Sequence, residues 1–177
     1  MVKKLIKFIT QDEFEQIFKY TLKTNKKNKK QLALAMLLSF EAGLRISEIV
    51  GYLDNVPKLE QKHVDMKRNE IRLEDAKGGK DRVTILPKRF NVAAYNMLPL
   101  KLERRTLQRW VSCCGKKVLG RALTPHKLRH GFATHLLDSG MPVNQIQVLL
   151  GHANISTTMI YAHTNPKQAL DGAREVF

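Results

Sequence analysis

Residues Thr124–Gly140 read TPHKLRHGFATHLLDSG and combine a helix signal with basic side chains. Thr124 is a favourable N-cap residue and Pro125 suits the first helical position, so we expect a helix from here to about Gly140. His126 and Arg129 are three residues apart and therefore share one face of that helix. The backbone N–H groups at a helix start favour a bound phosphate. Alone, this pattern is most often a solvated helix face, so its meaning depends on the basic groups around it.

The rest of the chain predicts an α+β fold that is mainly α. Thr10–Glu13 is typical of a capping box that opens a helix, and the strongly apolar stretch Lys30–Ala42 predicts a second helix that Gly43 ends. Further helices are expected around Ser47–Tyr52, after Pro87, over about Glu103–Lys117, after Pro142, after Ser156 and after Pro166.

One small antiparallel sheet interrupts the helices. Glu70–Glu74 and Arg82–Ile85 alternate polar and apolar side chains, and the glycine-rich turn Lys77–Asp81 lies between them. This pattern predicts a β-hairpin over about 70–86, with room for a third strand near His63–Met66.

Composition narrows the class of protein. The 177 residues suit one domain, and 43% hydrophobic with 27% charged residues excludes a disordered, collagen-like or coiled-coil chain. The 31 Lys and Arg against 16 Asp and Glu give a net charge of +15. Such an excess indicates a polyanionic partner, with nucleic acid ahead of an anionic membrane surface.

The stretch Lys23–Lys30 is expected to be a loop that is either a solvated charge run or a phosphate-contacting segment. Its DNA-binding candidates are Lys26, Lys27, Lys29 and Lys30.

The cysteines and the N-terminus indicate a compartment. Cys113 and Cys114 are adjacent, so an ordinary disulfide between them is excluded and a reducing environment is expected. The first residues have no apolar stretch of signal-peptide length. The longest apolar run, Leu32–Leu38, falls far short of the ~20 residues that span a bilayer. We therefore expect a cytoplasmic protein without a membrane partner.

Several further polar residues are candidates for chemistry. Arg45 follows an apolar helix and has apolar neighbours, so we expect it to be partly buried and paired, with Glu48 as its partner. His152 follows a glycine, and Tyr161 comes nine residues later. Lys77 lies at the hairpin tip. Each of these residues, taken singly, is better explained by a structural role, but their joint order along the chain is distinctive.

That order resembles the tyrosine recombinases, the phage integrase family. Ala42–Ile49 is similar to the first box of that family, Thr124–Gly140 to the second, and Leu149–His163, LLGHANISTTMIYAH, to the third. The resemblance runs from about Thr10 to the end of the chain. It implies the fold of the family's catalytic domain, which is helical with one small antiparallel sheet.

The resemblance also implies roles for individual residues. Arg45 and Arg129 match the arginines that hold the scissile phosphate, and Glu48 matches an acidic residue that supports the site. Lys77 matches the general acid, with Lys80 as the alternative and as a further DNA contact. The remaining matches are His126 and His152 as phosphate-site histidines and Tyr161 as the nucleophile.

The implied activity is site-specific cleavage and rejoining of double-stranded DNA through a 3′-phosphotyrosine, without metal or ATP. Planar guanidiniums bind phosphate oxygens in pairs, and preorganised positive charge stabilises the transition state. The covalent phosphotyrosine conserves the bond energy, so no cofactor is expected.

The family also sets expectations for domains and partners. We expect residues 1–177 to be a single catalytic domain, without the N-terminal core-binding domain that family members carry. The family members act as tetramers on DNA, and residues 165–177 resemble the C-terminal helix that docks onto a neighbouring protomer. Packing of that helix on its own domain is equally compatible with its apolar positions.

Three other classes of function compete with this one. A DNA-binding protein without catalysis explains the charge but requires no tyrosine nucleophile. A relaxing topoisomerase shares the covalent step and lacks strand exchange. A zinc protein is suggested by His126 and His130 at i and i+4, although no third ligand with recognisable spacing follows.

Overall fold

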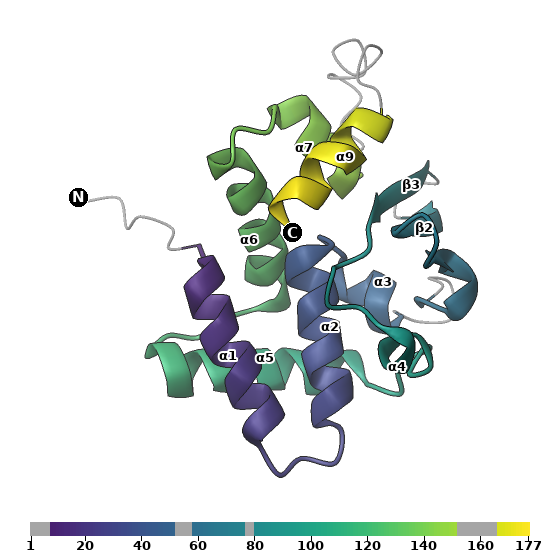
Figure 1. Cartoon of the computed structure of the whole chain (residues 1–177). Helices are drawn as coiled ribbons and strands as arrows, with labels where there is room; N and C mark the ends of the chain where they lie inside the picture. The colour runs from purple at the N-terminus through teal and green to yellow at the C-terminus, as the bar shows by residue number, and fades with distance from the viewer. Residues whose placement is uncertain (1–7, 52–57, 77–79, 152–165) are drawn as a thin grey trace, which may run out of the picture.

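The structure is a computed structural model of the chain and describes residues 8–51, 58–76, 80–151 and 166–177 (Figure 1). Its α-helices are α1 (Gln11–Lys23), α2 (Lys29–Glu41), α3 (Ile46–Val50), α4 (Val92–Tyr95), α5 (Arg104–Leu119), α6 (Pro125–Asp138), α7 (Val143–Leu150) and α9 (Pro166–Val176). A 3₁₀ turn, η1 (Gln61–His63), precedes the strands β1 (Val64–Asp65), β2 (Glu70–Ala76) and β3 (Lys80–Ile85). The mainly helical α+β prediction is confirmed.

The local signals at the helix ends work as expected. The Thr10 hydroxyl accepts a hydrogen bond from the Glu13 backbone N–H at 3.2 Å, and the Glu13 carboxylate accepts one from the Thr10 backbone N–H. Thr124 caps α6 by accepting from the Lys127 N–H. Gly43 follows α2 with φ +63°, a backbone conformation that side chains with a Cβ rarely adopt. These residues fix where α1 and α6 begin and where the chain leaves α2.

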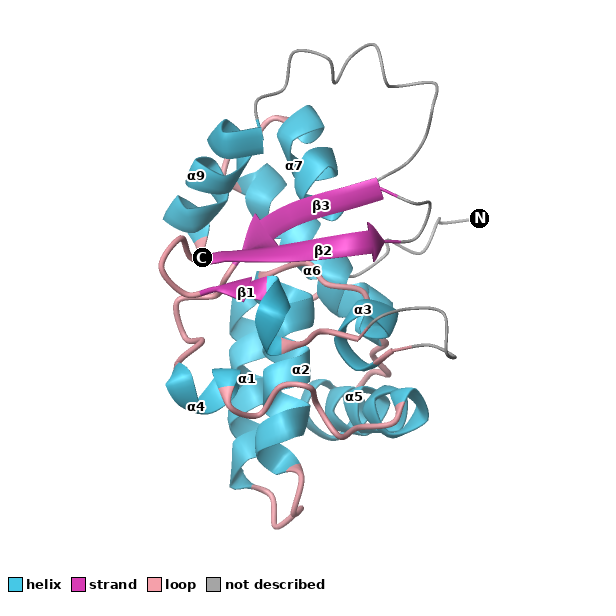
Figure 2. Cartoon of the chain, turned by 90° about the vertical axis from the view of Figure 1, so that its right-hand side faces the viewer, coloured by secondary structure: helices cyan, strands magenta, loops and turns pink. Residues whose placement is uncertain are grey.

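The strands form one antiparallel sheet in the order β1-β2-β3, with Val64 opposite Ile71 and Ile71 opposite Thr84. The hairpin and its third strand are therefore confirmed. Figure 2 shows β3 on the side of the sheet that faces α7 and α9, both of which contact it. Thr84 and Arg82 are buried, although the alternating pattern places them on the polar face of β3. Both faces of this strand are covered, because helices distant in the sequence pack there.

The apolar side chains form two clusters that meet at the strand β3. The larger cluster joins α1, α2, α5 and the first turns of α6, with Phe14, Phe40 and Val111 fully buried. The smaller one joins α6, α7, α9 and the end of β3. Figure 1 shows α5 crossing α1 and α2 at one end of the molecule, and α7 with α9 at the other. The residues singled out around Arg45 and Arg129 lie between these two clusters.

The basic stretch 23–30 is not wholly a loop. Lys23 belongs to the last turn of α1, and α2 begins at Lys29, one residue before its expected start. Only the linker between the two helices is irregular, since the apolar face of α2 needs a full first turn to pack. Lys26 lies in that linker, with its ammonium 5.0 Å from the centre of the Trp110 ring.

The C-terminal helix α9 packs on its own chain in this structure. Ala169, Leu170 and Ala173 are buried against α7 and β3. The Phe177 ring lies 5.2 Å from that of Phe132. Arg174 Nη2 donates to the Arg68 carbonyl at 2.7 Å and to the Glu70 carboxylate at 3.2 Å. Docking of this helix onto a neighbouring protomer stays a prediction.

Candidate active site

The buried carboxylate of Glu48, on α3, is the centre of the site. Arg45 Nη1 donates to Glu48 Oε1 at 2.8 Å, and the Arg45 backbone N–H donates to Oε2 at 2.6 Å. Arg82 Nη2 donates to the same Oε2 at 2.6 Å, and Arg129 Nη1 is 3.8 Å from it. The expected pairing of Arg45 with Glu48 is confirmed. We call these four residues (Arg45, Glu48, Arg82 and Arg129) the Glu48 cluster.

The three arginines of the Glu48 cluster also hold the last turn of α7. Arg82 Nη1 donates to the Leu149 carbonyl, Arg129 Nη2 to the Leu150 carbonyl at 2.6 Å, and Arg45 Nη2 to the Gly151 carbonyl at 3.4 Å. The final carbonyls of a helix have no partner within the helix and carry partial negative charge, so cations are favoured there. Each of three successive carbonyls thus has its own guanidinium. The cluster joins α3, β3, α6 and the end of α7.

Arg129 is held from a second side. Its Nη1 donates to the Gly43 carbonyl at 2.6 Å, and its side chain is only 7% exposed, whereas that of Arg45 is 25% exposed. A Cβ at Gly43 would lie 2.6 Å from the Phe132 ring, so the glycine allows α2 and α6 to approach closely here. The guanidinium of Arg129 is therefore fixed by backbone atoms of two distant segments, while Arg45 faces the solvent side.

The electrostatics of the cluster follow from burial. Burial raises the pKa of Glu48, but Arg82, the hydrogen bonds to the carboxylate and Arg129 together lower it below its usual value. Burial lowers the pKa of Arg82. Burial, with Arg82 and Arg45 nearby, lowers the pKa of Arg129 to about 9. Three guanidiniums around one carboxylate leave the group positively charged, which favours an anion.

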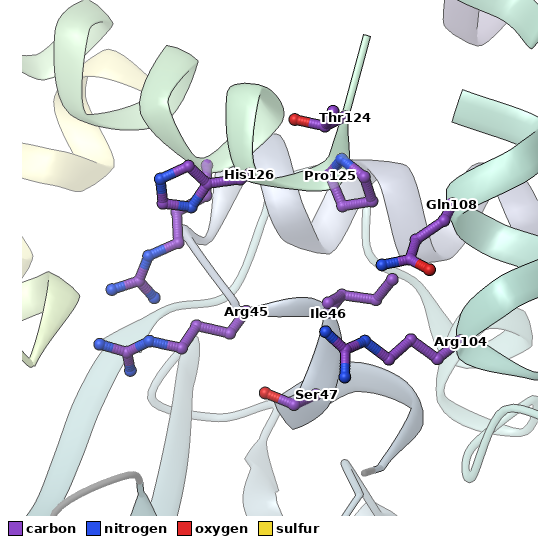
Figure 3. A pocket seen from close by; sticks show the side chains of 9 residues that line it. Arg45, Ile46, Ser47, Arg104, Gln108, Thr124, Pro125 and His126 are labelled. Atoms are coloured by element: carbon purple, nitrogen blue, oxygen red, sulfur yellow. The ribbon is translucent and has the colours of Figure 1, made fainter. Parts of the chain in front are cut away.

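A pocket of about 380 Å³ opens onto the cluster. Its walls include Arg45 and Arg129, the N-terminus of α6 with His126, and Arg104 with Gln108 from α5. Figure 3 shows the side chains of Arg45 and His126 on one side of the pocket, and Arg104 reaching in from α5 on the other. Three guanidiniums, an imidazole and a helix N-terminus around one opening form an arrangement that suits a phosphate group.

The structure thus brings Arg45, Glu48, His126 and Arg129 together. Lys77, His152 and Tyr161 lie outside the described residues. Lys80 is the first residue of β3, next to the turn, and only its backbone is described. Lys26, Lys27 and Lys30 are exposed and Lys29 is half-buried, in the linker between α1 and α2 and the first turn of α2.

Two groups of site residues were missed by the sequence analysis. Arg82 has a side chain only 3% exposed, and its place in an alternating strand predicts the opposite. Arg104 and Gln108 line the pocket from one face of α5, and their i, i+4 spacing was the available signal.

The histidines of α6 form a pair of rings. The centroids of His126 and His130 lie 4.3 Å apart in an edge-to-face arrangement, and Phe8 is 6.1 Å from His130. Burial, with His126 and Arg129 nearby, lowers the pKa of His130. In the described part of the chain, no three His, Cys, Asp or Glu side chains are grouped to hold a metal ion. No helix there is both long and apolar enough to cross a membrane.

Comparisons with known proteins show which chains and folds resemble this one. Tyrosine recombinase XerA of Pyrococcus horikoshii is 37% identical to this chain over 183 residues, which cover 93% of the chain and 59% of the relative. Among solved structures, the integrase from mycobacterium phage Brujita superimposes with a TM-score of 0.73 at 20% identity, over 100% of this chain and 60% of that one. The XerH site-specific recombinase, solved bound to palindromic difH substrate, gives a TM-score of 0.66 at 22% identity over 96% of this chain and 52% of that one.

The chain thus spans about three fifths of the length of the curated relative. The solved structures show a shared fold. The model of the phage integrase family matches residues 7–101 and 96–168, which include every segment that builds the cluster. On these matches and this arrangement, the chain belongs to the phage integrase family.

Proposed function

We propose that this chain is the catalytic domain of a site-specific tyrosine recombinase, which cleaves and rejoins double-stranded DNA. The observation that carries the proposal is the convergence of Arg45, Arg129 and His126 on one pocket, with both guanidiniums fixed by Glu48 and by backbone carbonyls. A preorganised pair of guanidiniums stabilises the charge that a phosphodiester gains as its phosphorus becomes five-coordinate.

In the proposed reaction, the Tyr161 hydroxyl oxygen attacks the scissile phosphorus and the bond from phosphorus to the 5′-oxygen breaks. The tyrosine proton goes to a base, for which His126 is the candidate, and Lys77 gives a proton to the departing 5′-oxygen. A free 5′-hydroxyl then attacks the 3′-phosphotyrosine and releases the tyrosine. One phosphoester bond replaces another in each step, so the sequence consumes no ATP.

The partner of this domain in the proposal is double-stranded DNA. The net charge of +15 supports it, as does the placing of Arg104 and Gln108 from α5 beside the phosphate pocket. The XerH recombinase of similar fold was solved on its DNA substrate. We extend the proposal to a tetramer on DNA, acting in the cytoplasm, as the free cysteines Cys113 and Cys114 suggest.

A nicked duplex substrate tests the proposal. When the short strand beyond the scissile phosphate diffuses away after cleavage, religation stops and the covalent protein–DNA adduct accumulates. We expect an adduct that survives denaturation, forms in excess EDTA and is absent from Tyr161→Phe. Tyr95→Phe, on the described helix α4, is the control variant and should form the adduct at the wild-type rate.

The same experiment separates the competing functions. DNA binding with no adduct from the wild-type protein would favour a DNA-binding protein without catalysis. An adduct combined with relaxation of any supercoiled plasmid, at no preferred site, would favour a topoisomerase. Loss of the adduct in EDTA would favour a metal-dependent enzyme.

A further inference from the structure

Arg82 is the member of the Glu48 cluster for which the pocket offers no direct use. Its side chain is 3% exposed, less than those of Arg45 and Arg129, and it does not line the pocket. Burying a guanidinium is costly unless it is paired and hydrogen-bonded. A cation kept at this depth requires a reason beyond packing, because an apolar side chain would fill the same space at lower cost.

The two ends of the Arg82 guanidinium serve two different elements. Nη2 donates to Glu48 Oε2 at 2.6 Å, and Nη1 donates to the Leu149 carbonyl in the last turn of α7. The other oxygen of Glu48 holds Arg45 Nη1 at 2.8 Å. The Glu48 carboxylate thus connects Arg82 to Arg45, the half-buried arginine of the pocket. A planar guanidinium fixes two acceptors at a set angle, which a lysine ammonium on a flexible stem does not reproduce.

The glycine that ends α7 shows how close this contact is. Gly151 has φ +62°, and a Cβ there would lie 2.4 Å from Arg82 Cδ. The stem of Arg82 therefore lies against the backbone of Gly151, and its head reaches the carbonyl two residues earlier. Arg82 links β3 to the end of α7 through both its stem and its head.

We propose that Arg82 is a positioning residue for the phosphate pocket: it fixes the Glu48 carboxylate, which in turn aligns the Arg45 guanidinium relative to the end of α7. The proposal rests on the function proposed above. Without Arg82, Glu48 retains Arg45 and Arg129 as cationic neighbours, but Oε2 loses its shortest side-chain donor. Oε2 then keeps its hydrogen bond from the Arg45 backbone N–H, so the carboxylate can turn about that bond, and the Arg45 guanidinium on Oε1 turns with it.

The test is single-turnover cleavage of the nicked duplex by Arg82→Met, with DNA binding measured in parallel. We expect binding close to wild type and cleavage slower by about a hundredfold, the loss typical when a reacting group is displaced by about 1 Å. Arg82→Lys keeps the charge and should recover only part of the rate. It also carries the test if Arg82→Met does not fold.

Thr84→Val is the matched control. Thr84 is two residues away on the same strand, fully buried, and donates to the Ala42 carbonyl at 2.9 Å. Among the described residues its hydroxyl bonds neither Glu48 nor the end of α7, so its loss should lower the melting temperature and leave cleavage close to wild type. An equal loss of cleavage in Thr84→Val would attribute the effect of Arg82 to general disruption of β3 and overturn the proposal.

A double-mutant cycle separates positioning from stability. If Arg82 acts through Arg45, adding Arg82→Met to Arg45→Ala should slow cleavage no further, because the group that Arg82 aligns is already gone. If the rate losses of the two single variants multiply in the double variant, or if Arg82→Met cleaves at the wild-type rate, the positioning role of Arg82 is refuted. If the wild-type protein itself forms no adduct, the proposed function fails first, so the two failures are distinguishable.

Discussion

Arg129 Nη2 donates a hydrogen bond to the Leu150 carbonyl at 2.6 Å, which joins the second box of the family to the third. Leu150 is the last residue of α7, and His152 follows two positions later in the sequence. The arginine proposed to bind phosphate therefore also caps the C-terminus of α7. Its hydrogen bond to the Gly43 carbonyl connects it to the segment that follows α2. Because the backbone fixes the guanidinium before DNA binds, little reorganisation is needed at the moment of reaction.

Arg129→Lys should cleave more slowly than wild type, and its rate relative to wild type should fall further as pH rises from about 6 to 9. The environment that lowers the pKa of Arg129 to about 9 acts on a lysine whose ordinary pKa is only about 10.4, so the lysine loses charge at lower pH. Single-turnover rates at each pH, taken as ratios to wild type, measure this effect.

Arg45→Lys is the control for that profile. The side chain at position 45 is a quarter exposed, so a lysine there is less desolvated and should keep its charge to higher pH. Equal pH dependence of the two variants would contradict the role of burial at Arg129.

Glu48→Gln should lower the free energy of unfolding at neutral pH by about 3–5 kcal/mol, because it removes one partner of a buried ion-pair group. The folded-state pKa of Glu48 lies below its unfolded value, so its contribution is present above pH 4.5 and is lost as pH falls through the folded value. The variant should therefore show a shallower loss of stability on acidification. Denaturant titrations at several pH values measure both effects, with Glu175→Gln as the control for loss of an exposed carboxylate.

Gly151→Ala should destabilise the fold more than Gly120→Ala. Both glycines end helices in the left-handed region, with φ +62° and +66°, so the backbone cost of about 1–2 kcal/mol is shared. A Cβ at Gly151 meets Arg82 Cδ at 2.4 Å, whereas a Cβ at Gly120 meets no described atom within 4 Å. The difference in their unfolding free energies measures the contact with Arg82. Equal destabilisation would mean that this contact relaxes without cost.

Replacing Lys26, Lys27, Lys29 and Lys30 by Gln should weaken binding to all duplexes alike. Each phosphate contact that is lost should reduce the slope of log K against log salt by about 0.9. Replacing two exposed lysines elsewhere, Lys67 and Lys88, by Gln is the control for the loss of net charge. An unchanged slope would identify the segment as a solvated charge run, and a loss on one sequence only would show that it reads bases.

The sequence predicted the contacts between residues that are close together along the chain. The capping box at Thr10, the N-cap at Thr124 and the pairing of Arg45 with Glu48 each involve residues three apart, and all three are present. The position of Arg82 was not predictable in this way. Its partners lie 34 and 67 residues away, and its burial depends on α7 covering a strand face that alternation marks as polar. The start of α2 at Lys29 was missed because a lysine run has no apolar period.

The most direct test of the account is to find which of the four tyrosines carries DNA after reaction with the nicked duplex. The trapped adduct is digested with protease and nuclease, and the modified peptide is identified by mass spectrometry. The account predicts a nucleotide joined through its 3′-phosphate to Tyr161 and to no other residue. A modified Tyr20, Tyr52 or Tyr95, a serine adduct, or a 5′-phosphate linkage would contradict it.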